Sequence, residues 1–351
     1  MTGAAQPGGG DVPAPTVAVS GAGGFLGSRV ATAFERAGWR VLRLTHTGTG
    51  PGTVPFHLGA AVEATVLGDV SAVVHCAYDF SLVSGDEVQR VNVAGARLLV
   101  DAAVDAGVPT VIGISSISAF DGARSLYGRA KLATERHILG RGGAVVRPGL
   151  VWEGADHDPG GMFGALTASV RRSRVVPLIG GGSQLQYLVH IDDLSALLVG
   201  LADGTVANPG TPITAAAPIG RPLRSLLAAI AHQEGRRPVF VPVPWRAVWL
   251  VLRAAEIARV PVGFRSDSVS SLVHQDPTPD LGTTSLAWGF RAYAPSVMNM
   301  ADALPAVEWG VKSARPLPDR VDGGGVHGRS SDGGPGLRCS PDNSSEGDVP
   351  R

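Results

Sequence analysis

The 351-residue chain is poor in cysteine, in aromatic residues and in net charge. Only Cys76 and Cys339 occur, which predicts neither a disulfide framework nor a cysteine-based metal site and fits a reducing, cytoplasmic setting. Lys plus Arg and Asp plus Glu both total 30, so no overall basic field exists to attract a phosphate backbone. We therefore expect no nucleic-acid partner and no bound metal.

Long hydrophobic runs are also missing. The opening "MTGAAQPGGGDVPAP" has neither the basic start nor the apolar stretch of a signal peptide. The most apolar late segment, residues 239–260, is interrupted by prolines and arginines. We expect no signal peptide and no membrane span. Residues 1–15 and 315–351 are rich in glycine and proline, with few large apolar residues, and are predicted to be disordered.

What the chain does contain is an alternation of short valine-rich runs and helix-like segments. The runs are "TVAVSG", "RVLRLT", "AVVHCA", "TVIGISS" and "GAVVRPG". This pattern predicts an α/β fold of the Rossmann type over residues 16–150, a doubly wound parallel sheet buried on both faces. Helices dominate residues 151–314, which we expect to form a smaller, mainly helical substrate-binding lobe with some segments returning to the sheet. Trp245 and Trp249 are expected in the core of that lobe.

A glycine cluster separates the first strand from the first helix. Gly21, Gly24 and Gly27 follow one another at three-residue intervals, as expected for a tight turn that brings a pyrophosphate to a helix N-terminus. The alternative is a plain glycine turn, since the chain has 48 glycines. Its position between strand and helix favours a dinucleotide-binding turn.

Further segments follow in a characteristic order: "VVHCAY", Asn92 in "VNVAG", "ISSIS", "YGRAK", "VVRPGLVWEG" and "GGGSQLQYLVHIDDL". With the glycine cluster, they make residues 16–310 resemble the extended short-chain dehydrogenase/reductase superfamily, in its NAD-dependent epimerase/dehydratase branch. The resemblance implies NAD(P) binding, and family members are often homodimers. The implied cofactor-binding residues are Gly21, Gly24, Phe25, Leu26, Gly27, Arg43, Thr45, His46, Ala77, Asn92, Tyr127, Lys131 and Pro148.

The resemblance also implies a catalytic set of Ser116, Tyr127 and Lys131. Tyr127 and Lys131 lie four residues apart on a predicted helix, so both project from one face. The ammonium is expected to lower the pKa of the phenol toward the working range, while Ser116 holds the reacting oxygen. Ser115 and Ser118 are the other serine candidates. Alone, the Tyr–Lys spacing is equally typical of a surface pair.

The end of the second strand, at Thr45 and His46, lacks the carboxylate with which NAD-preferring members bind a ribose hydroxyl. Because Arg29 and Arg43 lie nearby, we favour NADP(H) over NAD(H). The alternative is that both arginines are simply solvated.

The sequence is less informative about the substrate. Leu150 replaces the asparagine, and Gln186 the arginine, that sugar-nucleotide members tend to carry. Ser118, Gln186 and Arg265 are candidate substrate contacts, although a salt bridge would equally explain Arg265. His190, Asp192 and Asp193 are interpreted as a helix cap rather than a metal site.

Together these features predict an enzyme that transfers hydride at a carbonyl or secondary alcohol of a small molecule, with tyrosine as acid/base. The alternatives are a nucleotide-sugar epimerase or 4-ketoreductase, and a non-catalytic NAD(P)-binding sensor or assembly protein.

Overall fold

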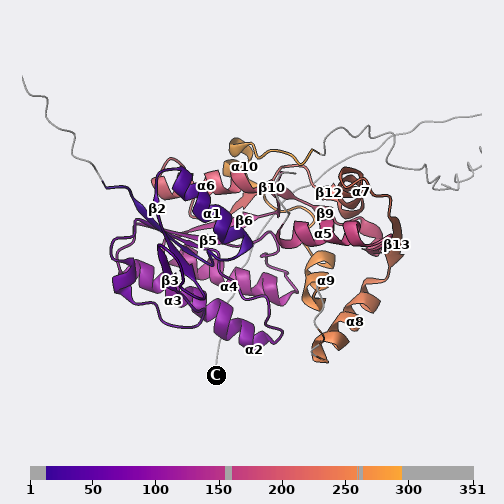
Figure 1. Cartoon of the computed structure of the whole chain (residues 1–351), viewed down its shortest axis with the longest axis horizontal. Helices are drawn as coiled ribbons and strands as arrows, with labels where there is room; N and C mark the ends of the chain where they lie inside the picture. The colour runs from indigo at the N-terminus through magenta and orange to yellow at the C-terminus, as the bar shows by residue number, and fades with distance from the viewer. Residues whose placement is uncertain (1–12, 155–159, 259, 261–263, 295–351) are drawn as a thin grey trace, which may run out of the picture. The chain divides into compact units, whose positions relative to one another are not determined.

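The computed structural model describes residues 13–154, 160–258, 260 and 264–294. Its centre is a parallel seven-stranded sheet of order β11-β6-β5-β4-β1-β2-β3 (Figure 1). The strands are β1 Thr16–Ser20, β2 Arg40–Thr45, β3 Thr53–Pro55, β4 Ala72–His75, β5 Thr110–Ile114, β6 Ala144–Pro148 and β11 Ile213–Ala215. The predicted α/β class is confirmed. Apart from residues 13–15, the segments predicted to be disordered lie outside the described residues.

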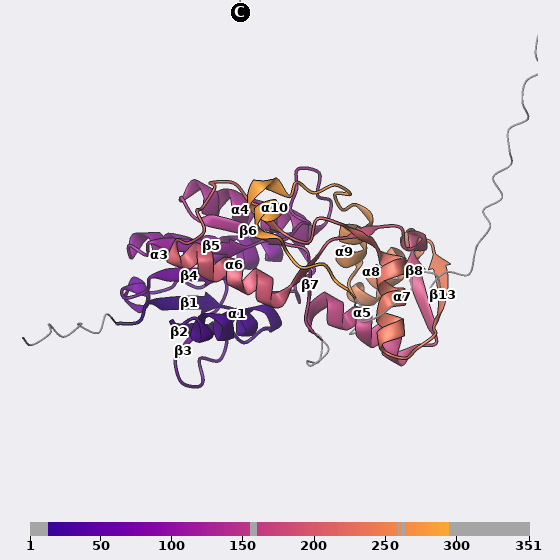
Figure 2. The same cartoon turned by 90° about the horizontal axis from the view of Figure 1, so that it is seen from above.

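Helices cover both faces of the sheet (Figure 2). Val17 and Val19 of β1 belong to one core with residues of α1 (Phe25–Arg36) and α6 (Ile191–Asp203). Ala18, between them, belongs to a second core with residues of α3 (Ala94–Asp105) and α4 (Leu126–Gly140). Because successive strand residues face opposite sides, an uninterrupted apolar run is what a sheet covered on both faces requires. Three short helical segments precede α3: η1 Ala64–Leu67, α2 Gly85–Glu87 and a π-helical turn, η2 Val88–Val93.

In the described residues after Pro148, the chain forms three small strand pairs and five helices besides α6. The pairs are β7 Leu150–Trp152 with β10 Leu188–His190, β8 Val175–Ile179 with β13 Val239–Val243, and β9 Leu185–Gln186 with β12 Arg221–Pro222. The helices are α5 Gly161–Arg172, α7 Leu223–Gln233, α8 Trp245–Ile257, α9 Ser266–Val273 and α10 Gly282–Trp288, and a short turn, η3, spans Gly180–Gly182. As expected, a late segment returns to the sheet, since β11 pairs with β6. The proposed domain boundary near residue 150 stays a prediction.

Trp245 and Trp249 do not form the core of the lobe, so that prediction was wrong. No residue of α8 is buried, and both tryptophans are partly exposed. The apolar core here is built from α5, α7, β8 and their neighbours, whereas α8 packs mainly against α9. Helical spacing identifies an apolar face but does not say what covers it. Within the described ranges, no helix combines the length and the apolar character needed to cross a membrane.

Candidate active site

The glycine turn between β1 and α1 brings backbone atoms closer together than residues with side chains would allow. Gly21 adopts φ +69, a conformation that other residues seldom adopt. A Cβ on Gly27 would lie 2.2 Å from the carbonyl oxygen of Gly21, so only glycine lets α1 start this close to the turn. Neither a side-chain cap nor an acidic residue occupies the first turn of α1. Its backbone N–H groups therefore suit a pyrophosphate, and the turn fits a dinucleotide.

The side chains of Phe25 and Leu26 pack against other parts of the protein. Only the backbone N–H groups of these two residues would therefore contact a dinucleotide. Leu26 lies against the core beneath α1. The Phe25 ring occupies the space next to Gly160, where a Cβ would come within 2.1 Å of it. Ala77 backs the same turn, since its N–H donates to the Ser20 hydroxyl at 3.3 Å. The Ser20 hydroxyl also hydrogen-bonds Nδ1 of buried His75 at 2.8 Å.

At the end of β2, Thr45 and His46 are in the expected place, but the two arginines already have partners. Arg43 donates to Glu35 at 2.7 Å and Arg29 to Glu153 at 2.5 Å. The hydroxyl of Thr45 accepts from the N–H of Gly48 at 3.1 Å. Because both arginines are paired with carboxylates, only the neutral side chain of Thr45 still favours NADP(H) over NAD(H).

Asn92 positions a loop. Its side-chain oxygen accepts from the N–H of Asp79 at 2.7 Å, and its amide donates to the carbonyl of the same residue at 3.0 Å. Asn92 is buried within the π-helical turn η2. Both contacts hold the chain that leaves β4, and neither reaches the glycine turn.

The N-terminus of α4 is capped from two directions. The Ser125 hydroxyl accepts from the N–H of Gly128 at 3.0 Å. The carboxylate of Asp267, on α9, accepts from Leu126 N–H at 2.7 Å and from Tyr127 N–H at 3.0 Å. A carboxylate is favourable at a helix N-terminus, so the lobe fixes the start of the helix that carries Tyr127 and Lys131. Sequence reasoning missed Asp267, although it lies two residues after Arg265.

Ser116, Tyr127 and Lys131 lie together beyond the end of β5. The Ser116 hydroxyl lies close enough to the Tyr127 phenol to lower its pKa. Lys131 donates to the Ile114 carbonyl at 2.8 Å, and its Nζ lies 5.9 Å from the centre of the Tyr127 ring. Burial lowers the pKa of Lys131 to about 8, so most of it is charged at pH 7.

The pKa of Tyr127 moves in the direction opposite to that expected. Burial raises it to about 12, and the Ser116 hydroxyl only partly opposes that rise. Two aromatic rings pack around the ring of Tyr127. Tyr78 meets Tyr127 edge-on with centroids 5.0 Å apart, and Phe80 stacks on it at 5.6 Å. Lys131 is turned toward the Ile114 carbonyl, and its Nζ is closer to the Tyr78 ring centre, at 5.1 Å. The phenol therefore keeps its proton at neutral pH.

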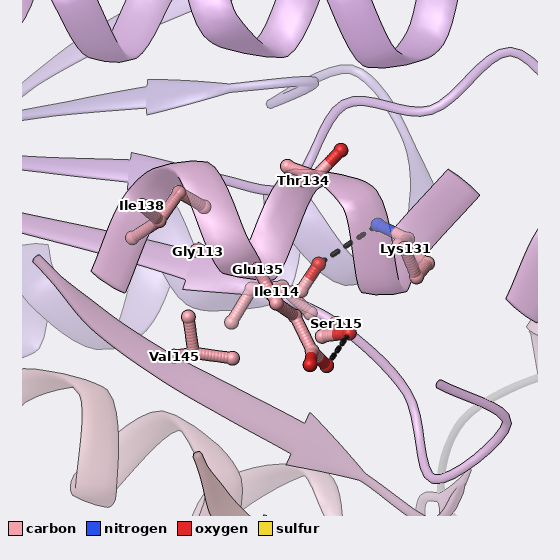
Figure 3. Close-up of a pocket in the computed structure, with 8 residues that line it drawn as sticks. All are labelled: Gly113, Ile114, Ser115, Lys131, Thr134, Glu135, Ile138 and Val145. Carbon is pink, nitrogen blue, oxygen red and sulfur yellow. Dashed lines mark hydrogen bonds between the residues drawn. The ribbon is translucent and has the colours of Figure 1, made fainter. Parts of the chain in front are cut away.

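Ser115 faces a small hollow under α4 that Lys131 also lines (Figure 3). Its hydroxyl donates to Glu135, which is buried and also receives two hydrogen bonds from Arg147, at 2.8 and 2.5 Å. The hollow has no room for a water molecule. Its polar groups are satisfied by one another, so it stiffens the junction of β5, β6 and α4.

The three candidate substrate contacts are held by other protein groups. Ser118 accepts from Ser271 at 3.0 Å, and Gln186 donates to Gln275 at 3.1 Å. Arg265 contacts Glu256 at 3.3 Å and donates to the carbonyl of Phe80 at 3.0 Å. Arg265 thus ties the loop after β4 to the lobe, in line with the salt-bridge alternative. Pro148 ends β6, and its carbonyl accepts from Ile117 N–H at 3.2 Å.

The His-x-Asp-Asp segment is a helix cap, as interpreted from the sequence. The His190 side chain accepts from Asp192 N–H at 3.2 Å at the start of α6. Asp193 pairs with Arg291 at 2.5 Å. Within the part of the chain that the structure describes, no group of three or more His, Cys, Asp or Glu side chains could hold a metal ion.

Two glycines of α4 give a matched test of this geometry. A Cβ on Gly128 would lie 2.3 Å from the Ser118 carbonyl oxygen, whereas one on Gly140 meets nothing within 4 Å. We expect Gly128→Ala to lower the free energy of unfolding by about 1–3 kcal/mol through overpacking, despite the better helix propensity of alanine. Gly140→Ala should leave it unchanged or raise it by up to about 1 kcal/mol. Thermal denaturation of both variants measures this, and equal melting temperatures would contradict it.

Comparison with known proteins agrees with this architecture. The model of the NAD dependent epimerase/dehydratase family matches residues 17–210. A protein named ceramide reductase from Caulobacter vibrioides is 26% identical over 325 residues, which is 87% of this chain and 97% of that protein.

Solved structures show the same fold. A structure of MoeE5 in complex with UDP-glucuronic acid and NAD superposes with a TM-score of 0.56 at 23% identity, over 66% of this chain and 85% of that one. UDP-N-acetylglucosamine 4-epimerase from Bacillus cereus gives 0.54 at 16% identity, over 74% of this chain and 96% of that one. The family match spans the glycine turn, the Ser–Tyr–Lys set and the strands that position them, and the chain belongs to the NAD dependent epimerase/dehydratase family.

Proposed function

We propose that this chain is an NAD(P)H-dependent reductase that converts a ketone to a secondary alcohol, with Tyr127 as the proton donor. The observation that carries the proposal is the grouping of Ser116, Tyr127 and Lys131 beyond β5, in the same fold as the glycine turn.

A bound dihydronicotinamide supplies the hydride that reaches the carbonyl carbon. The chain's own residues act on the oxygen. Ser116 donates a hydrogen bond to the carbonyl, and the Tyr127 hydroxyl transfers its proton as negative charge develops there. Lys131 lies within 5.9 Å of the Tyr127 ring centre, so its ammonium stabilises the phenolate that remains. The new C–H and O–H bonds would replace the π bond of the carbonyl, one C–H bond of the dihydronicotinamide and the O–H bond of Tyr127.

The protonation state of Tyr127 supports the reductive direction. A phenol with a pKa of about 12 is protonated at neutral pH and cannot serve as a ready base for alcohol oxidation. Reduction needs a proton donor, and the alkoxide oxygen that forms is a stronger base than a phenolate, so the proton passes from Tyr127 to it.

A mainly apolar substrate is favoured over a sugar nucleotide. Exposed Phe80 stacks on Tyr127, and Leu150 and Gln186 stand where sugar-nucleotide members tend to carry polar or cationic groups. The relative that aligns over most of its own length is named a ceramide reductase. We therefore place the substrate among ketones with long aliphatic substituents.

The test begins with the thermal stability of the full chain in the presence of NAD+, NADH, NADP+ and NADPH. The dinucleotide that raises the melting temperature most is then used to assay aliphatic ketones of increasing chain length. Turnover that increases with chain length is the expected result. Binding without turnover of any ketone would instead favour a cofactor sensor.

The second candidate is a nucleotide-sugar epimerase or 4-ketoreductase. It is favoured by the superposition on structures that are named for UDP-sugar ligands or substrates. A UDP-sugar that raises the melting temperature, together with tightly bound NAD+ in the purified protein, would support it over the reductase.

We further propose a preference for NADP(H), because position 45 carries no charge to repel a 2′-phosphate. Thr45→Asp is expected to lower the ratio of kcat/KM for NADPH to that for NADH by about tenfold, which corresponds to ~1.4 kcal/mol. Thr49→Asp is the matched control, since it adds the same charge in the exposed loop after β2. Equal ratios in wild type and Thr45→Asp would overturn the preference.

A further inference from the structure

Exposed apolar side chains concentrate on one edge of the lobe. Of the thirteen large apolar residues that are exposed in the described part of the chain, seven lie on β8, β13, α8 or just after α8. They are Val175, Val239, Val241, Leu250, Val251, Ile257 and Val260. Figure 2 places β8 and β13 at the end of the lobe away from the central sheet, and Figure 1 shows β13 there as well. Such a concentration marks an interaction surface.

The outer side of α8 is apolar along its whole length. Ala247, Leu250, Val251, Ala254 and Ile257 are all exposed and recur at helical spacing, so they form one stripe. Leu250, Val251 and Ile257 are 61%, 69% and 74% exposed. The opposite side packs against α9. A helix in water normally turns its polar side outward, and α8 does the reverse.

Exposed arginines gather at the end of the β8–β13 pair that is away from α8. Residues 171–175 and 234–258 contain seven arginines and two glutamates, within a chain whose net charge is zero. Arg172, Arg174, Arg236 and Arg237 are exposed and have no carboxylate partner among the described residues. The parallel register of β8 with β13 pairs Val175 with Val239, and Val239 N–H donates to the Arg174 carbonyl at 2.8 Å. All four arginines therefore gather at one end of this strand pair.

We propose that the β13–α8 face, defined by these four arginines and by Val239, Val241, Leu250, Val251 and Ile257, docks on an anionic lipid surface. The arginines meet the headgroups, and the aliphatic side chains of α8 enter the boundary with the acyl chains. Trp245, at the start of α8, packs edge-on against His274 with ring centroids 5.4 Å apart, so it lies on the α9 side of the helix and leaves the aliphatic stripe free of aromatic rings. This docking goes beyond the proposed reductase activity and does not depend on it.

Charge and apolarity together select this occupant. A nucleic acid would use the arginines but leave the aliphatic stripe in water. A second copy of this face would cover the stripe, but it carries the same excess of arginine and no surplus of negative charge to meet it. A lipid surface with negative headgroups satisfies both parts of the face.

The test uses the full chain and sedimentation with two kinds of vesicle, phosphatidylcholine alone and phosphatidylcholine mixed with phosphatidylglycerol. We expect binding to the mixed vesicles, weakened by salt. Changing Arg172, Arg174, Arg236 and Arg237 together to Gln should raise the lipid concentration for half-maximal binding on the order of a hundredfold. The matched control changes Arg36, Arg40, Arg90 and Arg97, which are exposed on the Rossmann part, to Gln. This control should bind like wild type.

A second variant separates the apolar contribution from charge. Leu250→Ser combined with Val251→Ser should keep salt-sensitive binding but reduce the quenching of tryptophan fluorescence by brominated lipid. Circular dichroism and melting temperature establish that each variant is folded.

Three results would overturn the proposal. The first is no binding of wild type to the mixed vesicles. The second is equal weakening by the two arginine sets. The third is a wild-type dimer, seen by analytical ultracentrifugation, that the Leu250→Ser/Val251→Ser variant dissociates, since the stripe would then belong to a second copy.

Discussion

Replacing Tyr127 by phenylalanine is expected to lower kcat by about 10²- to 10⁴-fold, the range of a lost general acid. The change removes one hydroxyl and leaves the ring that packs against Tyr78 and Phe80. Affinity for the dinucleotide, measured by quenching of protein fluorescence, should stay close to that of wild type. The loss would then belong to the chemical step.

Tyr78→Phe is the matched control for this prediction. Its ring touches that of Tyr127, but its hydroxyl makes no hydrogen bond within the described residues. We expect a much smaller change in kcat. If both variants were slowed equally, the effect would come from packing in the aromatic cluster, and Tyr127 would not be the acid.

Replacing Gly27 by alanine is expected to weaken dinucleotide binding by about ten- to a hundredfold, or ~1.4–2.8 kcal/mol. The new Cβ would lie 2.2 Å from the Gly21 carbonyl oxygen, and backbone on both sides leaves no flexible atom to yield. Either α1 or the turn must move, and the N–H groups that suit the pyrophosphate move with it.

Gly23→Ala tests whether this effect is specific. Gly23 lies in the same turn, yet the nearest heavy atom to its Cβ would be Thr45 Cγ2, at 4.0 Å. Fluorescence titration with the preferred dinucleotide should give a dissociation constant near that of wild type. A comparable loss in Gly23→Ala would mean that the turn tolerates no side chain at all, and the steric account of Gly27 would be wrong.

The sequence predicted the strands, motifs and turns that are formed by residues close together along the chain. The valine-rich runs identified five of the seven sheet strands, and the order of short motifs pointed to Ser116, Tyr127 and Lys131. The glycine turn belongs to the same class, because all its contacts involve β1, α1 and the ends of adjacent strands.

Contacts between distant parts of the chain could not be predicted in this way. Arg29 reaches Glu153, and Asp267 reaches the start of α4, across more than a hundred residues. The pKa of Tyr127 depends on which rings bury it, and the lowering expected from Lys131 does not contribute to its shift. Trp245 and Trp249 were misplaced because helical spacing is the same whether an apolar face turns inward or outward.

The carboxylate of Asp267 has a consequence for building hybrid enzymes from this family. Both its oxygens accept from the first turn of α4, so the helix that carries Tyr127 is completed by a residue of the lobe. A lobe transplanted from a relative would have to bring an acceptor to this position. Without one, the hybrid would keep the Tyr–Lys motif, but the start of the helix that carries Tyr127 would lose its capping carboxylate.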